Sequence, residues 1–129
     1  MKSVFIVSPL LALLMQGEGT AAEVIAHPSV SLSADEIRDV FLGEKQLVGN
    51  LRLVPIDNSA IQPEFLARVL QTDGQKYAAR WTKKSFREGL APPSVRGSDA
   101  EVIAFVRSTP GAVGYVSKTA TGVKVLGKF

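Results

Sequence analysis

The sequence contains no cysteine and only one histidine, His27, among its 129 residues. The absence of cysteine excludes disulfides, thiol nucleophiles and cysteine-based metal sites. It also excludes a lipid-anchored lipoprotein signal, which needs a cysteine to carry the lipid. A single imidazole cannot make up a set of zinc ligands by itself. We therefore expect neither a metal nor any other cofactor.

Hydrolase motifs are missing as well. No Gly-x-Ser-x-Gly stretch is present to form a nucleophile elbow. Asp57 and Ser59 lie too close together in the sequence to divide the usual triad roles with His27. The sequence therefore predicts a protein that is not an enzyme.

The net charge is small, and basic residues are scattered apart from one small cluster. The chain has 15 basic and 12 acidic residues, a formal net charge of +3. The only basic cluster is Lys83-Lys84 with Arg87, which we interpret as a solvated helix face. A nucleic-acid partner is not indicated.

Long hydrophobic runs are also absent, since the longest apolar stretch, Val4 to Met15, is shorter than the ~20 residues of a membrane span. It follows Lys2 and precedes small and polar residues that end at Ala22, the pattern of a secretory signal peptide. We expect residues 1–22 to be cleaved, leaving residues 23–129 as one periplasmic domain without membrane insertion. The alternative is an uncleaved anchor.

Hydrophobic periodicity in the remaining chain predicts alternating helices and strands, and therefore an α/β fold. Ser33 with Glu36, and Ser98 with Glu101, have capping-box spacing. The expected helices cover 33–43, 62–71, 75–88 and a segment that begins after Ser98; the expected strands cover 24–26, 51–56, 113–116 and 123–126, the last of them an edge strand. Residues 89–97 contain Pro92-Pro93 and are expected to form a loop.

Several of these segments together resemble a known family. They are "LSADEIRDVFLGEK" at 32–45, "PIDNS" at 55–59, the helix from Pro63, the helix bearing Trp81, and "TPGAVGYV" at 109–116. In this order they resemble one lobe of the periplasmic phosphate-binding proteins of ABC transporters, which have the type 2 periplasmic-binding-protein fold. The resemblance covers residues 32–116. It implies a single lobe with a mixed sheet flanked by helices, export, and an ABC permease as a partner.

The resemblance also implies a place for a ligand. In the family, a strand-turn-helix segment typically reads Arg-x-Asp-x-Ser-Gly-Thr and binds phosphate. Here Asp57 and Ser59 match, whereas Pro55 stands in the Arg position, Ala60 replaces the Gly and Ile61 replaces the Thr. The loss of the Arg removes the bidentate guanidinium that neutralises a phosphate.

The candidate ligand-binding residues are accordingly Asp57, Asn58, Ser59, Ala60 and Ile61. Because strand residues alternate between faces, we expect Arg52 to point away from the face of Pro55 and to be no substitute for the missing Arg. The alternative for Asp57, Asn58 and Ser59 is that they only form the turn and cap the following helix.

Two functions remain open. The first is a solute-binding-like module with weak binding of phosphate or another small oxyanion, completed by a second subunit or a partner because the family's other lobe is missing. The second is a protein–protein interaction or scaffold domain that has lost ligand binding. In that case the former ligand face would contact another protein.

Overall fold

The computed structural model describes residues 21–118 and 121–129. The predicted signal peptide, residues 1–22, lies outside the described residues except for its last two positions. None of the helices in the described ranges is both long and apolar enough to cross a membrane.

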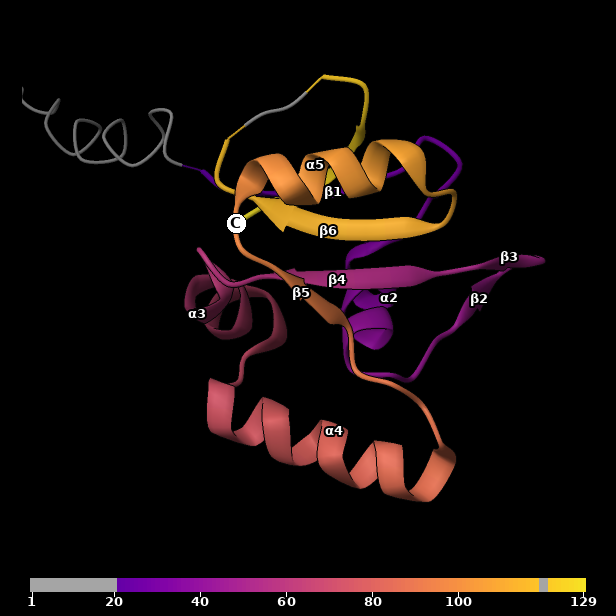
Figure 1. Cartoon of the computed structure of the whole chain (residues 1–129), viewed down its shortest axis with the longest axis vertical. Coiled ribbons are helices and arrows are strands. Elements are labelled where there is room, and N and C mark those ends of the chain that lie inside the picture. Colours follow the sequence, from indigo (N-terminus) through magenta and orange to yellow (C-terminus); the bar gives the residue numbers. More distant parts are fainter. Residues whose placement is uncertain (1–20, 119–120) are drawn as a thin grey trace, which may run out of the picture.

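Five strands form one mixed sheet, and two short strands form a separate hairpin (Figure 1). The strands are β1 (Glu23–Ala26), β2 (Leu47–Val48), β3 (Leu51–Arg52), β4 (Val54–Asn58), β5 (Ser94–Arg96), β6 (Ala112–Val116) and β7 (Lys124–Lys128). The sheet order is β5-β4-β6-β1-β7, and β4 is parallel to both β5 and β6. β1 runs antiparallel to its two neighbours, β6 and β7. The carboxyl ends of β4, β5 and β6 therefore meet at one edge of the sheet.

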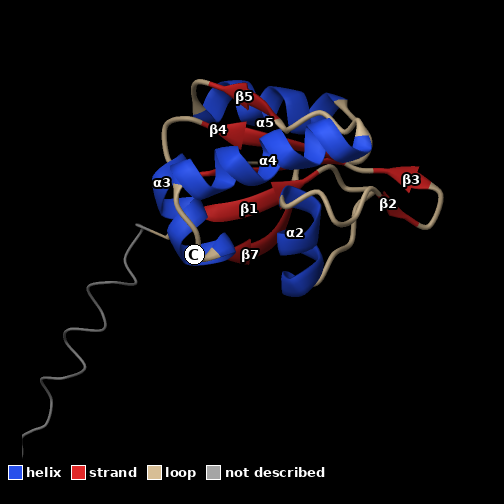
Figure 2. Cartoon of the chain, turned by 90° about the horizontal axis from the view of Figure 1, so that it is seen from below, coloured by secondary structure: helices blue, strands red, loops and turns tan. Residues whose placement is uncertain are grey.

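Helices cover both faces of this sheet (Figures 1 and 2). They are α2 (Ala34–Phe41), α3 (Gln62–Phe65), the π-helical turn η1 (Leu66–Leu70), α4 (Gly74–Glu88) and α5 (Asp99–Ser108). α5 packs Val102 and Val106 against one face. α2, α3, η1 and α4 pack against the other face, where the larger core lies. The predicted α/β fold with a mixed sheet flanked by helices is confirmed.

The helix ends follow from local sequence. The Ser33 side chain accepts a hydrogen bond from the Glu36 N–H, and Glu36 accepts one from the Ser33 N–H, so the predicted capping box forms. At α5 the Ser98 half of the predicted box forms, because Ser98 accepts from the Glu101 N–H. The Glu101 carboxylate instead accepts from the Gly97 N–H.

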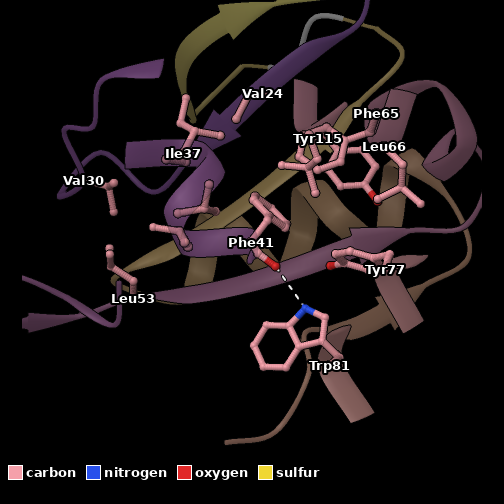
Figure 3. Close-up of a cluster of buried hydrophobic side chains, with 14 residues drawn as sticks. Val24, Val30, Ile37, Phe41, Leu53, Phe65, Leu66, Tyr77, Trp81 and Tyr115 are labelled. Carbon is pink, nitrogen blue, oxygen red and sulfur yellow. Dashed lines mark hydrogen bonds between the residues drawn. The ribbon is translucent and has the colours of Figure 1, made fainter. Parts of the chain in front are cut away.

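Aromatic side chains fill the larger core (Figure 3). The Phe65 and Tyr115 rings stack at 3.8 Å between centroids, and Phe41 packs edge-on against Phe65. Trp81 reaches this cluster from α4 and donates its indole N–H to the Phe41 carbonyl at 3.0 Å. The prediction that Tyr77 and Trp81 are core residues is confirmed by their burial.

Two local predictions were wrong, and one helix differs in type from the expectation. The segment expected to be one strand over 51–56 divides at Leu53 into β3, which pairs with β2, and β4, which joins the main sheet. The N–H of Leu53 bonds to the carbonyl of Gln46 rather than to a sheet neighbour. The expected loop 89–97 contains β5, which follows the two prolines as a short edge strand on β4. The helix predicted over 62–71 forms over residues 62–70, but it changes from an α-helix to a π-helical turn after Phe65, and it is capped by Gln71, which has a positive φ of 56°.

Candidate functional site

The segment proposed to bind a ligand lies where β4 ends, at the carboxyl edge of the sheet. In open α/β sheets this edge is where ligands commonly bind. Asp57 and Asn58 are the last residues of β4, and Ser59, Ala60 and Ile61 connect it to α3. Because β4 alternates, Asp57 and Asn58 point to opposite faces, and their environments differ.

Asp57 is enclosed in the larger core, with 2% of its surface exposed. The Tyr115 hydroxyl donates to Oδ1 at 2.7 Å, and the Tyr77 hydroxyl donates to Oδ2 at 2.9 Å. Burial raises the pKa of the Asp57 carboxyl, and these hydroxyl donors oppose the rise only in part. Burial and the nearby Asp57 charge also raise the pKa of both tyrosines. Asp57 therefore joins α4 to β6 beneath the loop.

Asn58 is fully buried on the opposite face and connects the sheet to α5. Its amide donates to Asp99 Oδ1 at 2.9 Å and to the Tyr115 carbonyl at 3.0 Å. Asp99 also accepts from the Ser117 hydroxyl, at 2.6 Å, and from the Ser117 N–H. Partial burial would raise the pKa of Asp99, but the Ser117 and Asn58 donors outweigh it, and the pKa is lowered.

The backbone N–H groups of the loop bond within the protein. The Ser59 N–H donates to the Arg96 carbonyl at 2.9 Å. The Ala60 N–H donates to Asn58 Oδ1 at 3.0 Å, and the Ile61 N–H donates to the Asn58 carbonyl at 3.2 Å. An anion at this loop could use these groups only by replacing the internal acceptors. The exposed Ser59 hydroxyl, which donates weakly to the Arg96 carbonyl at 3.3 Å, is easier to redirect.

A hollow of about 190 Å³ lies beside the loop. It is lined by Ala22, Ile61, Glu64, Arg68, Ser117 and Phe129. Arg68 forms no ion pair with any described residue. Arg68 is thus a basic residue in the lining of this hollow, whereas the family pattern has its Arg at the position of Pro55. α-Helical spacing from the loop could not have placed Arg68 here, because Ile61 precedes the helix and Arg68 lies in the π-helical turn.

Pro55 and Arg52 lie at the opposite end of β4 from the loop. Both line a second hollow, of about 220 Å³, together with Lys45 and Trp81. The strand divides at Leu53, so simple alternation does not extend from Pro55 to Arg52, and the two residues line the same hollow. Three strand positions, about 10 Å, still separate Pro55 from Asn58.

His27 is remote from this chemistry. Its Nδ1 lies 2.8 Å from the Ser29 hydroxyl, and it contacts neither Asp57 nor Ser59 by a hydrogen bond. Within residues 21–118 and 121–129, no group of three or more histidine, aspartate or glutamate side chains is placed to hold a metal ion.

Neither a comparison with family models nor a comparison with curated proteins gives a significant match. Solved structures do match. A putative phosphate ABC transporter substrate-binding protein with bound phosphate from Clostridium perfringens aligns with a TM-score of 0.62 at 12% identity. An ABC-type phosphate transport receptor from Vibrio cholerae aligns with a TM-score of 0.53 at 16% identity, and PstS from Borrelia burgdorferi aligns with a TM-score of 0.54 at 20% identity.

Each alignment covers 83% of this chain but only 44%, 45% and 46%, respectively, of the larger protein. The chain thus spans less than half the length of the structures that it matches. At these identities the similarity concerns the fold. The chain has the fold of one lobe of a type 2 periplasmic binding protein.

Proposed function

We propose that this chain is an exported, non-enzymatic solute-binding-like module that contacts a small oxyanion weakly at the carboxyl edge of its sheet. The observation that carries the proposal is the hollow beside Ile61, which is lined in part by Arg68, a residue without an ion-pair partner among the described residues. Phosphate is the first ligand to test, because one of the similar structures contains it.

The same geometry argues for low affinity in the isolated chain. Arg68 is solvent-exposed, and Glu64 lines the same hollow with the opposite charge. Exposed charges interact weakly in water, and the N–H groups of Ser59, Ala60 and Ile61 already have acceptors. A second subunit or a partner, such as a transporter permease, would have to supply further donors and exclude water. This role corresponds to the half of the larger proteins that the chain does not span.

A second candidate function is a protein-interaction or scaffold domain. It is favoured by the internal hydrogen bonds of the loop, because a loop whose donors are all satisfied is stable without a ligand. The carboxyl edge of the sheet would then contact another protein directly.

Calorimetric titration of the purified domain with phosphate and with sulfate tests the first candidate. We expect saturable binding with a dissociation constant of about 1 mM or weaker. Arg68→Gln should remove it, whereas Arg52→Gln, a matched loss of charge at the other end of β4, should not. Sedimentation in the presence and absence of phosphate reports whether a second copy completes the site.

Unchanged binding by the Arg68→Gln variant would refute the site. The absence of heat at about ten times the expected dissociation constant, for both anions, would leave the interaction domain as the function. Export is a separate question. Cell fractionation and intact-mass measurement should find the protein in the periplasm and beginning at Glu23, and a chain retaining residues 1–22 would contradict cleavage.

A further inference from the structure

α4 uses only one of its faces to join the fold. Its buried residues are Tyr77 and Trp81, which point into the larger core (Figure 3). The helix lies along the outside of the molecule, and its opposite face is directed away from the sheet (Figures 1 and 2). That outer face is unusual in both its charge and its one large apolar side chain.

A ridge of basic residues follows the outer part of the helix. Lys76, Arg80, Lys83 and Arg87 are spaced at i, i+4, i+7 and i+11, which places them in one row about 16 Å long. With Lys84 they line a groove of about 450 Å³, beside two acidic side chains. Its excess of three positive charges equals the formal net charge of the whole chain. The rest of the protein is thus close to neutral, and the positive charge is concentrated here.

The two acidic side chains neutralise only one side of the groove. Glu44 accepts from Lys84 at 2.9 Å and from Arg80 at 3.1 Å, and Glu88 accepts from Lys84 at 3.2 Å. In the described part of the chain, no ion pair involves the remaining basic residues of the ridge: Lys76, Lys83 and Arg87. These three side chains are available to carboxylates from outside.

Phe86 lies next to this ridge with 90% of its surface exposed. Ala79, Lys83 and Phe86 are spaced at i, i+4 and i+7, so Lys83 belongs both to the basic ridge and to the row that carries Phe86. A single exposed apolar side chain is ordinary on its own. An exposed aromatic ring beside unpaired cations is the composition of an interface anchor.

We propose that the outer face of α4 docks an acidic, helix-forming segment of a partner protein. A helix bearing carboxylates every three to four residues would match the spacing of Lys76, Lys83 and Arg87, since both helices share the same pitch. An apolar side chain on the neighbouring row of that segment would cover Phe86. This surface belongs to α4 and does not depend on the proposed oxyanion contact at the end of β4.

An anionic bilayer fits this face less well. Membrane-surface helices bury a broad apolar face, whereas the apolar face of α4 is already occupied by the core and Phe86 is its only large apolar side chain outside. Glu44 and Glu88 would also be repelled by anionic headgroups. An acidic peptide segment can place its carboxylates away from both Glu44 and Glu88.

The probe is a synthetic fluorescein-labelled helical peptide with glutamate at i, i+4, i+7 and i+11 and leucine on the adjacent row. A second peptide has glutamine in place of each glutamate. Binding to the purified domain is followed by fluorescence anisotropy at low and at physiological salt. The variants are Lys83→Glu with Arg87→Glu, and Phe86→Ala. The matched control is Lys118→Glu with Lys124→Glu, which changes the net charge equally at two exposed positions outside α4.

We expect the glutamate peptide to bind and the glutamine peptide to bind at least about tenfold more weakly. The charge reversal on α4 should weaken binding by more than about tenfold, and Phe86→Ala by about five- to thirtyfold. The control should change it by less than about threefold, because distant charges are screened. Equal binding by the two peptides, equal effects of the two charge reversals, or no effect of Phe86→Ala would overturn the proposal. Binding to phosphatidylglycerol vesicles through the same residues, without peptide binding, would replace it by a membrane contact.

Discussion

Replacing Tyr115 with phenylalanine isolates one hydrogen bond to a buried carboxylate. The variant keeps the ring that stacks on Phe65 and removes only the hydroxyl that lies 2.7 Å from Asp57 Oδ1. A hydrogen bond to a charged group contributes about 1.5–3 kcal/mol, and one to a neutral group about 0.5–1.5 kcal/mol. The cost of Tyr115→Phe should therefore depend on whether Asp57 is ionised.

The direction of this pH dependence follows from the pKa of Asp57. Burial raises that pKa above its usual value, so folding favours the protonated carboxyl. The stability that Asp57 contributes is then complete in acid and is lost as the pH rises through the raised pKa. The hydrogen bond from Tyr115 lowers the pKa of Asp57, so its removal raises that pKa further. We expect Tyr115→Phe to cost about 0.5–1.5 kcal/mol in acid and about 1.5–3 kcal/mol at higher pH.

Urea unfolding followed by the fluorescence of Trp81, the only tryptophan, measures both values. The series should run from about pH 4 to about pH 8, with Thr82→Ala on the exposed face of α4 as a control expected within about 0.5 kcal/mol of the parent. In an Asp57→Asn background the cost of Tyr115→Phe should no longer vary with pH. A cost below about 0.5 kcal/mol, or one that is equal at all pH values, would refute the reasoning.

Three further substitutions test the frame around the loop. Asn58→Ala should lower the unfolding free energy in urea by about 2–4 kcal/mol, because it removes three hydrogen bonds made by a fully buried amide; a neutral effect would contradict this. Gly111→Ala should cost about 2–4 kcal/mol by calorimetry, since Gly111 has a φ of +87° and an added Cβ would overlap the Arg52 carbonyl; an unchanged melting temperature would refute that clash. Asp99 has a lowered pKa, so its stabilisation is present near neutral pH and lost on acidification. Between about pH 6 and pH 3 the unfolding free energy of Asp99→Asn should therefore fall less than that of the parent protein. Equal falls in the two proteins, measured by urea unfolding, would contradict this.

Local chemistry predicted most elements and their ends. Ser33 with Glu36 and the stripe of Ile37, Val40 and Phe41 were sufficient for α2, and the spacing of Tyr77 and Trp81 placed the buried face of α4. These signals act within one or two turns, where the sequence is a direct guide to contacts. The strand at 94–96 was missed because two prolines precede it and because its only sheet neighbour, β4, lies far away in the sequence.

The candidate site was harder to predict, since its environment comes from distant segments. The sequence of the loop indicated a turn at Asp57, Asn58 and Ser59. It could not show that Tyr77 and Tyr115, the only two tyrosines of the chain, both donate to Asp57. Likewise, the Ser59 N–H donates to the Arg96 carbonyl, which belongs to the distant strand β5. Local sequence carries no information about such long-range partners.

The position of β1 constrains the order in which the fold can form. Among the strands of residues 21–118 and 121–129, β1 comes first in the sequence, yet it lies between β6 and β7, with Ile25 opposite Gly114 on one side and Val125 on the other. During synthesis β1 therefore cannot form its sheet hydrogen bonds until β6 and β7, near the end of the described chain, have been made. Such long-range pairing slows folding. Until β6 and β7 have been made, the apolar β1 has neither of its neighbours, and an unpaired strand of this kind is prone to aggregate.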